Sequence, residues 1–276
     1  MRIFGTGWWS SLSVRRRLLV VLVVIIIGAG AAAAGLRAWL GGPADALPSS
    51  SGPGAVLLVP GYGGSTSALD VLAARIRQTG RSATVVQLTG DGTGDLTQQA
   101  VVLDGYVNQA LRAGSGPVTV IGYSAGGVVA WLWAVRYDGA ARAARIITLG
   151  SPLHGARLAA LGSSLVPGEC PVACEQLVPG STLLTTLAQA PLRDRPPWLS
   201  LWTTDDQVVQ PPDSARLAGA VNVPLQSVCP AAVIQHGQLP TSSLVVGIVL
   251  RELATRQVTE PARADCSSLV ALGGTR

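Results

Sequence analysis

A Gly-x-Ser-x-Gly motif at the end of an apolar run is the feature that most restricts the fold of this chain. The run begins at Val118, the motif comprises Gly122, Ser124 and Gly126, and small residues in a helical pattern follow at once. With 33 glycines in the chain, the motif alone has little weight, because chance matches are common. The strand before it and the helix after it give it weight, since a nucleophile elbow is a sharp turn between those two elements. Side chains at the two glycine positions would crowd the flanking strand and helix, and we therefore predict a nucleophile elbow at Ser124.

Short apolar runs alternate with helical patterns along the rest of the chain. The expected strands are Ala55–Val59, Ala83–Leu88, Val118–Ile121, Arg145–Leu149, Trp198–Trp202 and Val221–Gln226. The expected helices are Ser67–Gln78, Asp95–Ala113, Ala125–Tyr137 and Thr241–Thr255, with Ser67 and Asp95 as N-caps. Continuously apolar strands separated by helices predict an α/β fold with a mostly parallel central sheet flanked by helices. Sites in such folds lie at the carboxyl ends of the strands.

The first 40 residues have the pattern of a membrane segment. Three arginines, Arg15–Arg17, precede Leu18–Gly35, which is eighteen residues long and carries no charge. Arginines before such a run place the N-terminus in the cytoplasm and the rest of the chain across the membrane. We expect an uncleaved, single-pass membrane-spanning helix, because the run just reaches spanning length. The alternative is a cleaved signal peptide, with a cleavage-like site at Ala31–Ala33 and a secreted product.

The chain accordingly divides into a signal or anchor segment at 1–40, a flexible Pro/Gly/Ser linker at 41–54 and one domain at 55–276. The net charge of +5 comes from the first part, since 15 arginines balance 15 acidic residues beyond Arg37. No basic stripe interleaved with aromatic residues appears, and we expect no nucleic-acid partner. We expect the protein to be a monomer that meets the membrane through its N-terminal segment.

Four cysteines in an exported domain suffice for two disulfides, and three pairings are possible. Cys170 and Cys174 are close enough for a local bridge, in which case Cys229 pairs with Cys266. A zinc site is the alternative, but the chain has no Cys-x-x-Cys pair and only two histidines. We therefore expect two disulfides, and neither a metal nor a cofactor.

A serine nucleophile needs a base, and the chain offers only His154 and His236. α/β-Hydrolases supply nucleophile, acid and histidine in that order along the chain. His236 follows both Ser124 and the strand-end pair Asp205 and Asp206, whereas His154 precedes every such acid. The order favours His236 as the base, with one of the two aspartates orienting it. The residues by themselves leave open which aspartate that is.

An oxyanion is held by two backbone N–H groups aimed at the position where charge develops. One comes from the residue after the nucleophile, Ala125, and the other from the loop after an early strand. The glycine-rich segment Pro60–Gly64 has that position, so the Tyr62 N–H is the second candidate. A phosphate-binding loop is the alternative, but the segment lacks the Lys-Ser/Thr ending and the G-x-G-x-x-G spacing of such loops.

Six blocks of the chain resemble, in order, those of the bacterial class 2 lipases, which are secreted triacylglycerol lipases and esterases of the α/β-hydrolase superfamily. The blocks are Pro60–Gly64, Gly94–Leu96, Val120–Gly127, Thr148–Gly155, Thr204–Pro211 and His236–Pro240. The resemblance extends from about Ala55 to Arg256, and six blocks in order are far more specific than any one of them.

The resemblance implies roles for individual residues. They are Ser124 as nucleophile, Asp206 as acid, His236 as base, and Tyr62 and Ala125 as oxyanion donors. Asp206 is implied over Asp205 because the family's acid lies five residues before a proline, here Pro211. His154 is implied to belong to a structural turn, and the stretch 170–181 resembles a local disulfide block seen in some members.

The resemblance also implies an activity: hydrolysis of lipid or acyl esters through an acyl-enzyme intermediate. The alternatives are a cell-envelope acyltransferase with the same triad and an inactive hydrolase-fold binding protein. Pro60 and Tyr123 depart from the family, since histidine is commoner at both positions. Neither residue belongs to the implied triad, so the departures concern the substrate and not the catalytic groups.

Overall fold

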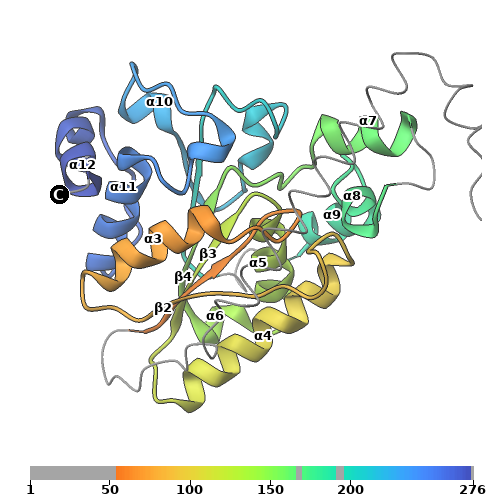
Figure 1. Cartoon of the computed structure of the whole chain (residues 1–276), viewed down its shortest axis with the longest axis horizontal. Helices are drawn as coiled ribbons and strands as arrows, with labels where there is room; N and C mark the ends of the chain where they lie inside the picture. The colour runs from red at the N-terminus through yellow and green to blue at the C-terminus, as the bar shows by residue number, and fades with distance from the viewer. Residues whose placement is uncertain (1–53, 166–169, 191–195, 275–276) are drawn as a thin grey trace, which may run out of the picture. The chain divides into compact units, whose positions relative to one another are not determined.

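Six strands form the central sheet of the structure, a computed structural model that describes residues 54–165, 170–190 and 196–274 (Figure 1). The strands are β1 (Val56–Val59), β2 (Ala83–Val85), β3 (Val118–Tyr123), β4 (Ala143–Leu149), β5 (Trp198–Trp202) and β6 (Val221–Pro224). Their order is β2-β1-β3-β4-β5-β6, and each neighbouring pair is parallel. The predicted parallel sheet is confirmed.

Helices connect the strands. They are α3 (Ser67–Arg77), α4 (Leu96–Arg112), α5 (Ala125–Arg136), α6 (Gly139–Arg142), α7 (Arg157–Leu165), α8 (Val172–Gln176), α9 (Thr182–Ala188), α10 (Leu225–Val228), α11 (Ser243–Ala254) and α12 (Cys266–Gly273). Short 3-10 turns are η2 (Pro212–Ala215), η3 (His236–Gln238) and η4 (Arg263–Asp265). The four predicted helices correspond to α3, α4, α5 and α11.

Alternate side chains of β1 enter two separate hydrophobic cores. Leu57 and Val59 pack in the core that includes α4 and α5, whereas Val56 and Leu58 pack in the core that includes α3 and α11. Figure 1 shows α3 and α11 together on one side of the sheet and α4 on the other. Since successive side chains of a strand point to opposite faces, the sheet is buried on both faces. This is the reason that its strands read as continuously apolar.

Strands β2 and β6 end earlier than the runs from which they were predicted. β2 ends at Val85 and not at Leu88, because its ladder with β1 stops at the Leu58–Val85 pair and Gln87 is exposed. β6 ends at Pro224, which has no N–H to extend the ladder, and α10 begins at the next residue.

One of the two predicted N-caps is correct. Asp95 caps α4, since its side chain accepts a hydrogen bond from the Thr97 N–H at 2.8 Å. The N-cap of α3 is Thr66 and not Ser67, and the Thr66 hydroxyl donates to Asp70 at 2.9 Å.

The predicted membrane segment at 1–40 lies outside the described residues, as does the linker apart from Gly54. Within the ranges that the structure describes, no helix is both long enough and apolar enough to cross a membrane.

Both predicted disulfides are present. Cys170 and Cys174 are joined with a Cα–Cα distance of 5.6 Å, and Cys229 and Cys266 with one of 5.2 Å. The longer bridge ties the end of α10 to the start of α12, which packs closely on α11. A Cβ on Gly247 of α11 would lie 1.9 Å from a carbonyl oxygen of α12, so the backbones of the two helices are in contact. The bridge therefore attaches the C-terminal helix to the segment that leads to His236.

We expect joint replacement of Cys229 and Cys266 by serine to lower the free energy of unfolding by about 4 kcal/mol, because the bridge limits a long loop in the unfolded chain. Joint replacement of Cys170 and Cys174 is the matched control, with an expected loss of about 2 kcal/mol for its short loop. Urea unfolding of the oxidised proteins measures both. An equal or larger loss in the control pair would contradict the loop-length argument.

Candidate active site

Ser124 occupies a strained turn between β3 and α5. Its backbone dihedrals are φ 53° and ψ −128°, and a positive φ is uncommon for a residue other than glycine. A Cβ on Gly122 would lie 2.5 Å from the Gly127 Cα, and one on Gly126 would lie 2.2 Å from the Val59 carbonyl oxygen. Both contacts are shorter than real Cβ atoms make. The elbow predicted from the motif is present, with glycine required on both sides of the serine.

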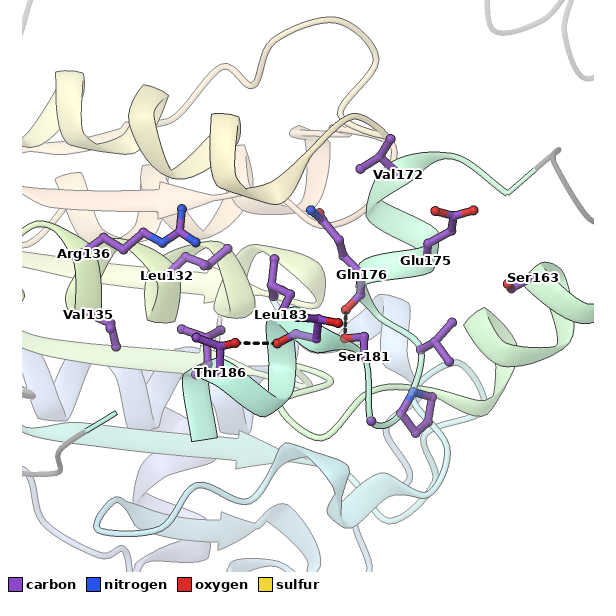
Figure 2. A pocket seen from close by; sticks show the side chains of 15 residues that line it. Leu132, Val135, Arg136, Ser163, Val172, Glu175, Gln176, Ser181, Leu183 and Thr186 are labelled. Carbon is purple, nitrogen blue, oxygen red and sulfur yellow. Dashed lines mark hydrogen bonds between the residues drawn. The ribbon is translucent and has the colours of Figure 1, made fainter. Parts of the chain in front are cut away.

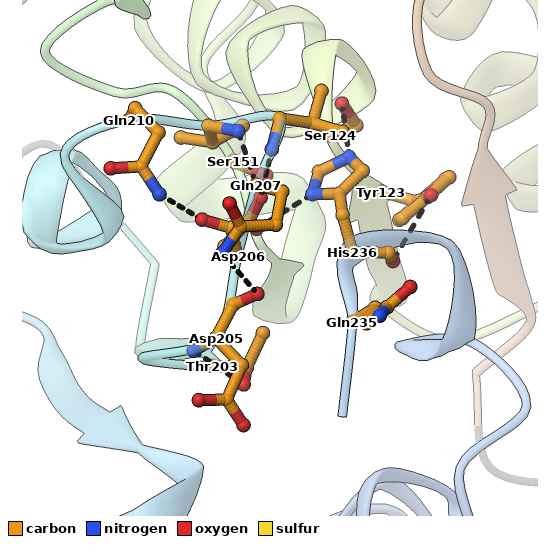
Figure 3. A network of polar contacts seen from close by, with 12 residues as sticks. Tyr123, Ser124, Ser151, Thr203, Asp205, Asp206, Gln207, Gln210, Gln235 and His236 are labelled. Atoms are coloured by element: carbon orange, nitrogen blue, oxygen red, sulfur yellow. Dashed lines mark hydrogen bonds and ion pairs between the residues drawn. The ribbon is translucent and has the colours of Figure 1, made fainter. Parts of the chain in front are cut away.

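The structure brings together the three side chains of the predicted triad (Figure 3). His236 Nε2 lies 3.0 Å from Ser124 Oγ, and His236 Nδ1 lies 2.7 Å from Asp206 Oδ2. Asp206 is 1% exposed and His236 is 6% exposed, so little water reaches the pair. The three groups form one continuous hydrogen-bonded chain from the carboxylate to the serine hydroxyl.

The Asp206 carboxylate is fixed by backbone donors as well as by the histidine. Its Oδ1 accepts hydrogen bonds from the N–H groups of Val208 and Val209, both at 2.8 Å. Asp205 belongs to a different network, in which its Oδ2 accepts from Gln226 Nε2 at 3.2 Å. Of the two adjacent aspartates, only Asp206 contacts His236 in the structure.

The loops that carry Asp206 and His236 are tied to each other behind the triad. The Thr203 hydroxyl, three residues before Asp206, donates to the Ile234 carbonyl at 2.7 Å. Gln226 Nε2 donates to the Thr203 hydroxyl at 2.9 Å and to the Ala232 carbonyl at 3.1 Å. These bonds join the loop of the acid to the loop of the histidine, and no pattern in the sequence predicted them.

Tyr123 contacts the histidine from the side of the elbow. Its hydroxyl donates to the His236 carbonyl oxygen at 3.2 Å, and the two ring centroids are 5.2 Å apart (Figure 3). Burial, with a smaller contribution from the Asp206 charge, raises the pKa of Tyr123 to about 12. The tyrosine therefore remains a neutral hydrogen-bond donor at physiological pH.

Gly150 packs against the other side of the acid–histidine pair. It has a φ of +57°, and a Cβ there would lie 3.2 Å from His236 Nδ1 and 3.3 Å from Asp206 Oδ2. A side chain at this position would press on the hydrogen bond between the two. The glycine follows β4 directly, and this position at a strand's carboxyl end was the signal that could have identified it.

The two predicted oxyanion donors lie beside the serine. A Cβ on Gly61 would be 2.9 Å from the Ser124 Cβ, so the Pro60–Gly64 loop lies against the nucleophile. Tyr62 and Ala125 both line the pocket that contains Ser124. Among the described residues, neither backbone N–H has a hydrogen-bond partner, and Ala125 is the first residue of α5, where N–H groups are not used by the helix.

A pocket of about 190 Å³ opens at Ser124. Its lining consists of Tyr62, Ser124, Ala125, Pro152, Ala156, Leu158, Ala159, Cys174, Leu177, Val208 and Val209. A second, larger hollow of about 760 Å³ lies between α5, α8 and α9 (Figure 2). None of the three triad residues lines the larger hollow.

His154 is separate from this constellation. It is exposed, and its ring Nδ1 and its backbone N–H both bond the Ser214 carbonyl, at 3.1 and 3.0 Å. These contacts fit the structural turn that the resemblance implied for it.

The parallel sheet, the elbow after β3 and the histidine-bearing loop before α11 define an α/β-hydrolase fold. The first of the similar solved structures is Aspergillus fumigatus lipase B, with a TM-score of 0.66 and 19% identity over 81% of this chain. The chain spans 59% of the length of that lipase. The mature Bacillus licheniformis lipase BlEst2 has a TM-score of 0.53 and 20% identity, covering 66% of this chain and 84% of that one.

A bromoperoxidase from Bacillus anthracis is also similar, with a TM-score of 0.52 and 14% identity over 74% of this chain and 92% of its own. Comparison with protein-family models and with curated protein sequences finds no match. At these identities the solved structures establish the α/β-hydrolase fold of the chain.

Proposed function

We propose that this protein is a serine hydrolase that cleaves carboxylic esters through an acyl-enzyme intermediate. The observation that carries the proposal is the hydrogen-bonded chain Asp206–His236–Ser124, with spacings of 2.7 and 3.0 Å, at a strained elbow. A nucleophile and a base within hydrogen-bond reach, with the base oriented by a third group, is the arrangement that activates a serine. The lipases among the structures with this fold support an ester as substrate.

Acylation begins when Ser124 Oγ attacks the ester carbonyl carbon while His236 Nε2 takes the hydroxyl proton. The carbonyl π bond opens, and its oxygen becomes an oxyanion held by the N–H groups of Tyr62 and Ala125. When the carbonyl re-forms, the bond to the alcohol oxygen breaks. The alcohol leaves with the proton from His236, and the acyl group remains on Ser124.

Deacylation repeats these steps with water. His236 takes a proton from the water as its oxygen attacks the acyl carbon, and then returns that proton to Ser124 Oγ as the carboxylic acid is released. Asp206 holds the imidazole with Nδ1 protonated and stabilises the imidazolium in both steps.

Labelling with a fluorophosphonate probe and hydrolysis of p-nitrophenyl butyrate test this proposal together. We expect one covalent adduct per chain, on the peptide that contains Ser124, and loss of hydrolysis in proportion to labelling. A folded protein that neither reacts with the probe nor hydrolyses the ester would overturn the assignment.

We further propose that the protein is related to the bacterial class 2 lipases. This proposal rests on the six sequence blocks described above.

We also propose that the catalytic domain acts on the outer face of the cytoplasmic membrane, held there by residues 1–40. The motivation is the uncharged run after Arg15–Arg17. We expect the native protein to sediment with membranes and to keep its N-terminal segment, which N-terminal sequencing would detect. A mature N-terminus between Gly30 and Ser51 would show instead that the segment is a cleaved signal peptide.

A further inference from the structure

The 190 Å³ pocket at Ser124 is apolar apart from the reacting groups. Beyond Tyr62, Ser124 and Ala125, it is lined by Pro152, Ala156, Leu158, Ala159, Cys174, Leu177, Val208 and Val209. Such a lining binds hydrocarbon and offers no partner to a charged or strongly polar substituent.

The pocket lies on the acyl side of the reacting carbon. The departing alcohol takes its proton from His236 Nε2, so its oxygen must lie next to that atom. His236 does not line the pocket, whereas both oxyanion donors and the nucleophile do. The ester part that enters the pocket is therefore the acyl chain.

The volume limits how much of an acyl chain the pocket holds. An apolar cavity of about 150 Å³ accommodates benzene, which has six carbons. At about 190 Å³ the pocket accommodates a chain of roughly six to eight carbons. Leu158 and Val208 line it and are 58% and 41% exposed, so they stand at its mouth. Carbons beyond the eighth pass these side chains into water, where they gain no burial.

Helix α8 is the wall that closes the pocket on one side. Its Cys174 and the following Leu177 line the pocket, whereas Val172, Glu175 and Gln176 line the 760 Å³ hollow on its other side (Figure 2). The five-residue helix thus separates the two spaces.

This wall is held in place at several points. The Cys170–Cys174 disulfide closes its first turn. Gln176 Oε1 accepts from the Leu96 N–H at 2.8 Å, and its Nε2 donates to Asp95 at 2.6 Å, so the end of α8 is bonded to the start of α4. The Leu177 carbonyl accepts the Ala156 N–H at 3.0 Å. The space behind α8 is therefore closed to an acyl chain that enters from Ser124.

We infer that this pocket is the acyl-binding site and that the protein prefers esters of short and medium-chain carboxylic acids, up to about eight carbons, with the volume of the pocket setting the length. The inference rests on the proposed ester hydrolysis. It gives the bridged helix α8 a part in substrate selection in addition to its structural one.

The experiment measures kcat/KM for p-nitrophenyl acetate, butyrate, hexanoate, octanoate, decanoate and laurate, each below its micelle-forming concentration. We expect kcat/KM to rise from acetate to hexanoate or octanoate and to rise no further with longer chains. A continued increase to laurate would overturn the inference while leaving the proposed function intact. Failure to hydrolyse any of the esters or to react with the fluorophosphonate probe would instead sink the proposed function.

Two variants change the pocket in opposite directions. Ala159→Leu fills it, and we expect the octanoate-to-acetate ratio of kcat/KM to fall at least tenfold. Leu177→Ala enlarges it, and we expect the preferred chain to lengthen by about two carbons. Val135 lines the larger hollow and not the pocket at Ser124, so Val135→Ala is the matched control and should keep the wild-type profile. If Ala159→Leu does not fold, Leu177→Ala decides, and an unchanged profile in a folded pocket variant that reacts with the probe would overturn the assignment.

Discussion

Replacement of Ser124 by alanine is expected to abolish ester hydrolysis and to leave the fold intact. The Oγ forms the covalent bond to the acyl group. It is also the atom that His236 Nε2, 3.0 Å away, deprotonates. Loss of a serine nucleophile lowers kcat by about a million-fold. Alanine retains the Cβ that contacts the Pro60–Gly64 loop, so the unfolding temperature should be unchanged. Steady-state kinetics with p-nitrophenyl butyrate and thermal unfolding provide the two measurements.

Ser151→Ala is the matched control for this substitution. Ser151 is buried behind the elbow, and among the described residues its hydroxyl has one hydrogen-bond partner, the Gly122 carbonyl, at 3.5 Å. We expect this variant to keep its activity within a few-fold of the wild type and to react with the fluorophosphonate probe. Retention of more than a few per cent of activity in Ser124→Ala would remove that serine from the mechanism.

The elbow could be predicted from the sequence because its residues lie close together along the chain. Ser124 and its two glycines lie within five residues, and the strand before them and the helix after them follow from short-range patterns. The glycines are needed because a Cβ at either position would collide with neighbouring backbone atoms, as the distances at Gly122 and Gly126 show. The contact at Gly122 lies within the turn itself and can be recognised without knowing the rest of the fold, whereas the approach of Gly126 to Val59 of β1 is seen only in the structure.

The surroundings of His236 could not be predicted in the same way. The Tyr123 hydroxyl reaches a carbonyl 113 residues further along the chain, and no local pattern encodes that contact. The sequence showed this tyrosine only as a departure from a family pattern. The same holds for the bond from Thr203 to Ile234, which depends on how two loops return to the same end of the sheet.

The pocket at Ser124 could not be predicted from the sequence either, because its apolar walls come from three separate segments of the chain. Ala159 lies on α7, Leu177 follows α8, and Val209 lies just after the acid. Helices α7, α8 and α9 were absent from the predicted elements, since α8 and α9 are short and the stretch is rich in Pro and Gly. The local disulfide was predicted, but its place beside the pocket follows only from the packing of α8.

The second prediction with a large expected effect concerns the two adjacent aspartates. Asp206→Asn is expected to lower kcat by about ten-thousand-fold, because an amide cannot hold the histidine in the tautomer with Nδ1 protonated or stabilise its cation. Asparagine has nearly the same shape as aspartate, so the 2.7 Å contact with His236 Nδ1 and the contacts from Val208 and Val209 should persist. The loss should therefore appear in kcat and not in folding. Asp205→Asn is the control.

Asp205 serves as the control because it is the neighbouring residue on the same loop, and it differs from Asp206 in its partner and in being only partly buried. Its carboxylate accepts one bond from Gln226, at 3.2 Å, which an asparagine oxygen also accepts. We therefore expect Asp205→Asn to change kcat by no more than a few-fold. Measurement of both variants with p-nitrophenyl butyrate over pH 5 to 9 distinguishes them. A large loss in Asp205→Asn with a small one in Asp206→Asn would show that the acid had been placed one residue too late, and that the contact between Asp206 and His236 is structural.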